Sequence, residues 1–510
     1  MSARAGGFLG AAVAPTRADR AIALVLGVVF AAVFFGLLQR RLWGDGHSLF
    51  ELAVFEDRPW WFTWLHPLYL PLGRILVALD PFGRPFDALG LLSAVPGAAA
   101  IGLSFYFARQ LGASRAGALV GAFLIGAAPA SVRFATLVEV HALHGFAVAL
   151  ALVLLVAWAP RWSARGLLVL QTALFALICS THLTAPTLAP GWIAFVIWVA
   201  ARNHPSLVEG RAWWRTAILA GIGTVIAFAA VALVAEWTYF RSTPEGLAAT
   251  SASFIGATTG GSRWPYVRSD WTTPLGLALI PLGVVILGIW RSPQAAGLRS
   301  KRHGVAIAGL LWLIPVFAFY TYWGMPNEGG YMAGSLVVLV ALIALIEQTP
   351  LGRVGVLSAA ALIPFVAWQS FADATAWKDV HALARRDDRI AALRVALPAG
   401  GLVVSFDPLH TPATIELPNV REFDVLFAVQ GLALTGRNPK QIAQEIPVWL
   451  DVRVGDQSGV IDASYRVFAA QAGPYAEIVA AFETAIQERF HVTPVPGVDW
   501  PLFAFERRAD

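Results

Sequence analysis

The chain has 510 residues, of which 57% are hydrophobic and only 14% charged, and its mean hydropathy is +0.64. Soluble globular proteins carry about a quarter charged residues, so this composition excludes an ordinary soluble enzyme. The 20 Trp and 31 Phe exclude a disordered chain. The formal net charge of +5 reflects an excess of arginines, as in the loops of membrane proteins, and a nucleic-acid partner is not expected.

The charged residues divide the chain into two parts. Residues 1–371 hold 14 acids and 24 Lys or Arg, whereas residues 372–510 hold 18 acids and 13 Lys or Arg. We therefore predict a transmembrane domain over 1–371 and a soluble domain over 372–510. The expected fold class is a polytopic α-helical membrane protein with a small C-terminal α/β domain.

Apolar segments recur along the first part, each compared with the ~20 residues needed to cross a bilayer. They predict 11 to 13 membrane spans, at 21–38, 66–79, 88–108, 116–137, 141–158, 166–180, 183–201, 216–235, 274–290, 303–323, 331–347 and 353–371. Two connections, 40–66 and 236–273, are long enough to do more than join spans. Which side of the membrane the C-terminal domain occupies depends on the number of spans, and hydropathy leaves this open.

The C-terminal part has the pattern of an α/β domain. An amphipathic helix is expected at 378–396, followed by a buried strand at 402–406. A second helix is expected at 474–490, followed by short strands near 491–495 and 502–506. No metal-ligand spacing, phosphate loop or catalytic triad pattern occurs there, so a binding or packing domain is expected.

Acidic residues are rare in the first part, and several cluster directly after the first span. Asp45 has a glycine on each side, which would let the backbone turn and leave the carboxylate facing a cavity. His47 and Glu51 are four residues apart, on one face if this segment is helical. Arg58 and His66 follow in the same connection. The alternative is a solvated interfacial loop with ordinary ion pairs.

Further polar residues interrupt the apolar segments. Glu139 and His141 stand between the fourth and fifth predicted spans, with Arg133 and His144 close by in sequence. His182 lies between two apolar runs. For these residues a helix cap or a hydrogen-bonded core histidine is the alternative to a binding site. Arg263 and Arg268 lie in the second long connection and are further candidates for binding an anion.

These motifs carry a resemblance to a known family. An acidic loop after the first helix, then His66-Pro67-Leu68-Tyr69, Glu139-Val140-His141-Ala142-Leu143 and Thr181-His182-Leu183-Thr184, resemble the GT-C superfamily of membrane glycosyltransferases. The likeness is greatest to the protein O-mannosyltransferase-like branch and covers roughly residues 20–200. That branch has Asp-Ser-Gly-Glu in the first loop, whereas here Asp45 is followed by Gly and His. The catalytic place therefore belongs to Asp45, which we favour, or to Glu51.

The resemblance implies an activity and roles for the residues. Such enzymes transfer a sugar, usually with inversion, from a polyprenyl-phosphate carrier to a protein, lipid or glycan hydroxyl outside the cytoplasm. Asp45 or Glu51 would be catalytic, and Mg²⁺ or Mn²⁺ is a possible cofactor. The residues expected to bind substrate are His47, Arg58, His66, Glu139, His141, His182, Arg263 and Arg268. The Ala-, Gly- and Arg-rich composition suggests a bacterium. The resemblance then implies a multi-pass protein of its inner (plasma) membrane with an extracytoplasmic active site.

Two other classes of function stay open. A transporter or flippase of a lipid-linked or anionic substrate would carry acids and broken helices near mid-bilayer, in two matching halves. Here the acids lie near span ends, and no internal repeat is found. A non-catalytic membrane scaffold would tolerate Asp45→Asn and Glu51→Gln, whereas a glycosyltransferase would lose its activity.

Overall fold

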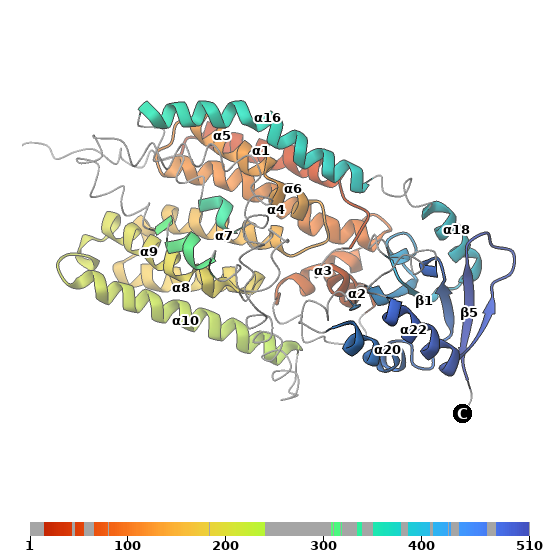
Figure 1. Ribbon diagram of the computed structural model, residues 1–510. Coiled ribbons are helices and arrows are strands. Elements are labelled where there is room, and N and C mark those ends of the chain that lie inside the picture. The colour runs from red at the N-terminus through yellow and green to blue at the C-terminus, as the bar shows by residue number, and fades with distance from the viewer. Residues whose placement is uncertain are drawn as a thin grey trace, which may run out of the picture.

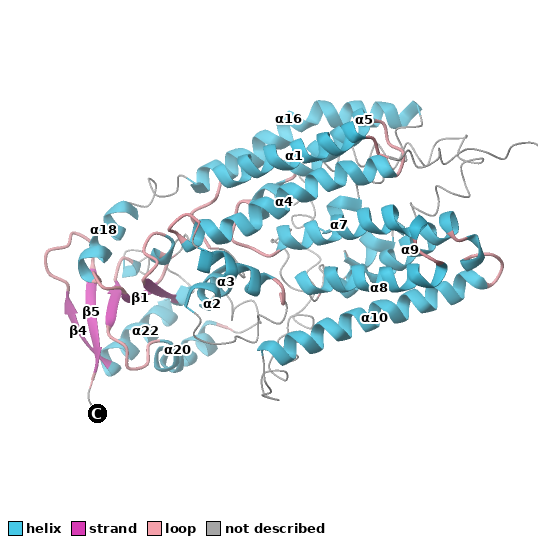
Figure 2. Ribbon diagram, turned by 180° about the vertical axis from the view of Figure 1, so that it is seen from behind, coloured by secondary structure: helices cyan, strands magenta, loops and turns pink. Residues whose placement is uncertain are grey.

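The computed structural model describes residues 15–42, 46–55, 66–79, 81–182, 184–239, 350–378, 386–407, 412–426, 438–466 and 476–508, with short pieces within 308–318, 334–338 and 428–429. In this part of the chain, long apolar helices form a bundle. Figure 1 shows a small sheet with its own helices at one end of the bundle. The view from behind shows the same arrangement (Figure 2).

Seven of the described helices are long and apolar enough to cross a membrane. They are formed by α1 (Arg17–Gly36), α4 (Pro85–Gln110), α7 (His141–Trp158) with the 3-10 turn Ala159–Arg161, α8 (Ala164–Thr181), α9 (Ala189–Asn203) with the preceding 3-10 turn Ala185–Leu188, α10 (Ala212–Tyr239) and α16 (Pro350–Lys378). The polytopic α-helical fold class is thereby confirmed. The predicted spans at 274–290, 303–323 and 331–347 lie wholly or mostly outside the described residues.

An eighth span is formed if two shorter helices are counted together. α5 (Arg115–Ala127) and α6 (Pro129–Ala135) occupy the predicted span 116–137 and meet at an angle of 60°. Pro129 lacks the backbone N–H that a continuous helix would use, so the helix breaks there and α6 starts with proline in its first turn.

The predicted span 66–79 was wrong, because this segment does not cross the membrane. Its helix α3 (Tyr69–Leu79) has 11 residues. That length gives about 16 Å, roughly half of the hydrocarbon thickness of ~30 Å. Arg40, just after α1, forms a 2.7 Å ion pair with Asp87 in the first turn of α4. The end of α1 and the start of α4 therefore lie together, and the chain between them returns to the same side.

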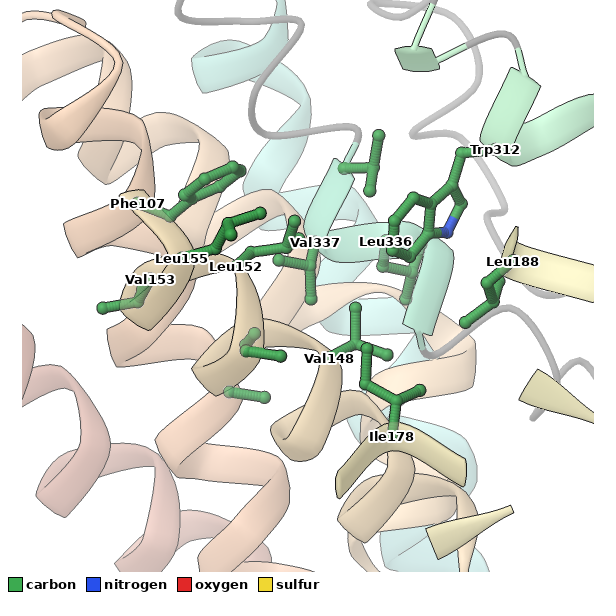
Figure 3. Close-up of a cluster of buried hydrophobic side chains, with 14 of the residues drawn as sticks. Phe107, Val148, Leu152, Val153, Leu155, Ile178, Leu188, Trp312, Leu336 and Val337 are labelled. Carbon is green, nitrogen blue, oxygen red and sulfur yellow. The ribbon is translucent and has the colours of Figure 1, made fainter. Parts of the chain in front are cut away.

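The core of the bundle lies around α4, α7 and α8. Phe107, Val148, Leu152 and Ile178 from these helices belong to one buried cluster with Trp312 (Figure 3). Apolar side chains gain little by leaving lipid for such a core, so close packing has to hold the helices together.

A glycine shows how close α1 and α4 come. A Cβ on Gly102 of α4 would overlap the carbonyl oxygen of Ala23 in α1. Only a residue without a side chain lets the two backbones approach this closely, which increases the van der Waals contact between the helices.

At the end of the bundle away from the sheet, a buried carboxylate joins three helices. Asp19 in the first turn of α1 accepts hydrogen bonds from Arg109 Nε at 3.2 Å and Arg115 Nε at 2.8 Å, and its side chain is fully buried. Thr16 caps the same helix in a capping box with Asp19. The ends of α1, α4 and α5 are thus joined on the side away from the sheet.

The C-terminal domain contains a five-stranded sheet in the order β2-β1-β3-β5-β4. Its strands are β1 (Gly401–Ser405), β2 (Val420–Asp424), β3 (Gly459–Asp462), β4 (Phe490–Pro494) and β5 (Leu502–Arg507). β1 pairs in parallel with β2 and β3, whereas β5 is antiparallel to β3 and β4. Parallel strands need crossover connections, and helices supply them here.

Helices cover both faces of this sheet, as expected for an α/β domain. α20 (Pro439–Arg453) and α22 (Ala476–Arg489) pack on one face through Ile446, Leu450 and Phe482. α18 (Arg386–Ala396) packs on the other face through Ile390 and Leu393. The predicted helices and strands of this region all have counterparts in these elements.

Arg389 of α18 is held in a buried ionic network against the sheet. Its Nε lies 2.6 Å from Asp462 Oδ2 and its Nη2 lies 2.6 Å from Glu422 Oε1. Burial alone would lower the pKa of Arg389, but the carboxylates of Glu422, Asp462 and Asp407 raise it well above its usual range. The network fastens α18 to β2 and β3.

We expect Arg389→Leu to destabilise the C-terminal domain by about 3–5 kcal/mol, because two buried carboxylates would lose their counterion. Arg394→Leu removes an exposed arginine from the same helix and should change stability little. Thermal unfolding of the purified protein in detergent checks this. Equal unfolding midpoints for the two variants would contradict the role given to the network.

The C-terminal domain lies at the end of the bundle where α1 ends and α4 begins. Ile415, in the 3-10 helix η8 (Ala413–Ile415), is buried in one cluster with Leu42, Phe50 and Phe86 of the membrane part. Figure 1 shows α2 (Gly46–Phe55) and α3 between the bundle and the sheet. The domain therefore lies at the same end of the bundle as the first connection.

Candidate active site

Glu139 lies at the point where three helices meet. It precedes α7, and its carboxylate accepts hydrogen bonds from the backbone N–H groups of Val140 at 3.0 Å and Gly46 at 3.3 Å. Its own backbone is bonded to the Ser93 hydroxyl of α4, at 2.9 and 3.2 Å. A carboxylate at a helix N-terminus is stabilised by the helix dipole, which favours a buried acid here. Glu139 therefore fixes the start of α2 against α4 and α7.

Four histidine side chains gather beside this point. His182 is central, with ring centroids at 4.6 Å from His66, 5.6 Å from His141 and 5.5 Å from His144. Each of the four is at most 5% exposed. They come from the turn before α3, the first turn of α7 and the end of α8, so three separate segments build this histidine cluster.

Local backbone geometry explains how the cluster forms. α8 ends at Thr181, and His182 follows in an extended conformation, which turns its ring back toward α7. The Ser180 carbonyl accepts a hydrogen bond from the Leu68 N–H at 2.8 Å, which brings the segment of His66 to the end of α8.

Neighbouring hydroxyl groups hold two of the rings. His144 Nδ1 lies 3.0 Å from Thr181 Oγ1, and His182 Nδ1 lies 2.7 Å from Thr184 Oγ1. Each contact fixes the orientation of one imidazole, so the cluster can present ring nitrogens in defined directions.

Two arginines extend the polar region. The Arg133 guanidinium lies 5.7 Å from the ring centroid of Phe134. The Phe134 and His141 rings are nearly perpendicular, with their centroids 4.8 Å apart. Arg41 is 4% exposed and donates from Nε to Gln39 Oε1 at 2.9 Å. Burial and the nearby charge of Arg133 lower the pKa of Arg41 to about 9, against the opposing charge of Asp373.

The two arginines and the histidine cluster together favour the binding of an anion. Arg41 is buried, Arg133 is half-buried, and their charges act on each other. Two such guanidinium groups attract a phosphate strongly, because each offers several N–H donors in a fixed plane. The imidazoles add further donors or acceptors. The chemistry available at this end of the bundle is therefore recognition of a phosphate next to carboxylates.

The structure brings together some of the predicted site residues and separates others. His66, His141 and His182 lie in the histidine cluster, Glu139 adjoins it, and the half-buried His47 belongs to α2. Glu51 is instead directed to the C-terminal domain, where Arg421 Nε lies 3.0 Å from its Oε1. Outside the described residues are Asp45, Arg58, Arg263 and Arg268.

Sequence reasoning named Arg133 and His144 as polar residues of this region but did not count them among the residues expected to bind substrate. His144 is three positions from His141 and so lies on the same face of α7, a spacing that could have identified it. Arg133 is near Glu139 in sequence, but its proximity to Arg41 has no sequence signal, since the two residues are 92 positions apart. Arg41 follows closely after the predicted first span, 21–38, and was not considered as a site residue.

The described residues do not fit a Mg²⁺ or Mn²⁺ site. Among them no group of three or more His, Cys, Asp or Glu side chains has the geometry to hold a metal ion. These ions also prefer oxygen ligands, whereas the cluster offers imidazoles. A divalent metal stays a prediction for the first-loop carboxylates, such as Asp45, that the structure does not describe.

Comparisons with solved structures show which proteins have a similar fold. The sequence matches no model of a known protein family and no curated protein. The structure is similar to ArnT from Cupriavidus metallidurans bound to undecaprenyl phosphate, with a TM-score of 0.57 and 15% identity. The likeness covers 96% of this chain and 98% of that one. The apo ArnT structure gives a TM-score of 0.50, with 14% identity over 94% of this chain and 97% of that one.

A second type of enzyme has the same fold. The oligosaccharyltransferase of Archaeoglobus fulgidus in its apo form is similar over 95% of this chain and 74% of its own, with a TM-score of 0.51 and 13% identity. Both proteins are GT-C glycosyltransferases, so this chain has a GT-C fold.

Proposed function

We propose that the chain is a membrane glycosyltransferase that takes a sugar from a polyprenyl-phosphate donor and transfers it to an acceptor hydroxyl. The observation that carries the proposal is the likeness, over 96% of the chain, to a structure of ArnT bound to undecaprenyl phosphate. The buried Arg41 and the half-buried Arg133 beside the histidine cluster support it, because a lipid phosphate would find N–H donors there.

The proposed reaction is a single displacement. The acceptor oxygen attacks the anomeric carbon, the bond from that carbon to the phosphate oxygen breaks, and polyprenyl phosphate leaves with the bonding electrons. The acceptor proton passes to Asp45 as general base. Attack opposite to the leaving phosphate inverts the anomeric centre. We favour Asp45 over Glu51, because Glu51 is ion-paired with Arg421.

Side chains of the histidine cluster and its neighbours would assist the departure of the phosphate. Negative charge grows on the phosphate as its bond to the sugar breaks, and Arg41 and Arg133 would stabilise that charge. His66, His141 and His182 would orient the phosphate or the sugar. Arg58, Arg263 and Arg268 stay candidates for the same task from segments that the structure does not describe.

The distribution of arginines supports an extracytoplasmic site. At the end of the bundle away from the sheet, the described residues include Asp19 and Glu209 but mainly arginines, namely Arg17, Arg20, Arg109, Arg115, Arg161, Arg165, Arg202, Arg211, Arg215 and Arg353. Positive residues favour the cytoplasmic side of a membrane. We infer that the histidine cluster and the C-terminal domain face outward from a bacterial plasma membrane.

Sugar transfer in purified membranes tests the function. Membranes with and without the chain receive radiolabelled polyprenyl-phosphate mannose, the donor suggested by the O-mannosyltransferase-like motifs, or other polyprenyl-linked sugars. We expect label to reach a protein, glycan or lipid fraction only when the chain is present. Failure of every donor to transfer its sugar, together with movement of the intact donor across vesicles, would establish a flippase instead.

A further inference from the structure

Different parts of the chain hold the helix α2, which follows Asp45, at its first residue and again in its second half. At its start, the Gly46 N–H donates to Glu139 Oε1 at 3.3 Å. Further along, Arg74 of α3 donates from Nε and Nη2 to the Leu52 carbonyl, at 3.3 Å each. These two contacts belong to the membrane part of the protein, whereas the Glu51 side chain of α2 is bound by another partner.

That partner is the C-terminal domain. Arg421 on β2 donates to Glu51 Oε1 from Nε at 3.0 Å and from Nη2 at 2.5 Å, and Arg453 at the end of α20 lies 3.8 Å from the same oxygen. The side chains of Arg421 and Glu51 are 23% and 30% exposed. Partial burial makes such a charge-assisted pair stronger than a fully exposed one.

An apolar contact lies beside this ion pair. Ile415 of the C-terminal domain is 2% exposed and belongs to one buried cluster with Phe50, Leu52 and Ala53 of α2. The domain therefore holds α2 by a charged contact and by an apolar contact at adjacent positions. Arg84 and Glu416, 3.7 Å apart, form a second ion pair between the two parts, and it does not involve α2.

We propose that Arg421 is a positioning residue for sugar transfer: by binding Glu51, it makes the C-terminal domain hold α2 in the geometry that transfer requires. The proposal rests on the proposed function and goes beyond it, because it gives the soluble domain a part in the chemistry. It also gives Glu51 a role in an interdomain contact instead of a catalytic role.

The test compares kcat and KM for transfer in Glu51→Gln, Arg421→Gln and the double variant. Misplacing a reacting group by about 1 Å can cost up to about 100-fold in rate. We therefore expect kcat to fall by about 10- to 100-fold in each single variant, with a smaller change in the donor KM. The double variant should be no slower than either single one, because both changes break the same contact.

Two further variants separate positioning from misfolding. Arg421→Lys keeps a positive charge within reach of Glu51 and should recover most of the lost rate. Arg84→Gln breaks the other interdomain ion pair and should leave kcat close to that of the wild type. Thermal unfolding of every variant identifies any that fail to fold.

Several outcomes would overturn the proposal. If Arg421→Gln has the wild-type kcat while the wild type transfers sugar, the inference fails and the proposed function stands. If Glu51→Gln is much slower than Arg421→Gln, Glu51 acts on the substrate itself. Absence of transfer by the wild type would mark the failure of the proposed function, and the positioning role would fail with it.

Discussion

Asp45→Asn is expected to lower the rate of sugar transfer by at least about 100-fold, because a general base contributes about 10²–10⁴-fold and an amide cannot accept the acceptor proton. Asp45 directly precedes Gly46, whose N–H is bound by the buried Glu139. The substitution keeps the size of the side chain, so the fold should be retained. Initial rates at saturating donor, normalised to the amount of protein in the membrane, measure the effect.

An acid at the same end of the bundle provides the control for Asp45. Asp87 is ion-paired with Arg40 at 2.7 Å and is given no part in the reaction, so Asp87→Asn should change the rate far less. A wild-type rate for Asp45→Asn would remove Asp45 from the mechanism. If the rate were then lost in Glu51→Gln, the catalytic place would pass to Glu51.

Gly46→Ala is expected to reduce transfer by about 10- to 100-fold without changing any reacting group. A Cβ on Gly46 would overlap the carbonyl oxygen of Val138, which is fully buried and cannot move aside easily. The start of α2 would have to shift away from Glu139 and carry Asp45 with it. Overpacking of this kind should also cost about 1–3 kcal/mol of stability. Transfer rates and thermal unfolding of the same preparation measure both effects.

Gly36 at the end of α1 offers a matched control for the same substitution. A Cβ there would meet no atom within 4 Å, so Gly36→Ala should leave both the rate and the unfolding midpoint near those of the wild type. Equal behaviour of the two alanine variants would show that α2 tolerates a shift. The link between the Gly46 contact and the geometry of Asp45 would then be lost.

Hydropathy predicted most of the membrane helices because a bilayer imposes one length and one composition on whatever crosses it. The boundaries of α7 and α8 agree with the predicted spans 141–158 and 166–180 to within two residues. The same reasoning failed for 66–79, since an apolar helix of 11 residues can also pack between a bundle and a soluble domain. The predicted span 66–79 is shorter than the ~20 residues needed to cross a bilayer, and this length was the signal against it.

The candidate site was predictable in its residue types and only partly in its geometry. Polar residues are rare in apolar sequence, so Glu139, His141 and His182 stood out without any structure. Their assembly with His66 into one cluster depends on how α3, α7 and α8 pack, and no spacing along the chain encodes that.

By itself the sequence determined that the chain is a multi-span membrane protein with a soluble α/β domain, and it identified the rare polar residues on which a site could be built. Tertiary structure alone decided that Glu51 faces Arg421, that Arg41 lies near Arg133, and that the soluble domain sits beside the first connection. The physical reason is the distance along the chain over which each kind of signal or contact acts. Hydropathy and helical period act between near neighbours in the chain, whereas ion pairs and buried clusters join residues up to 370 positions apart.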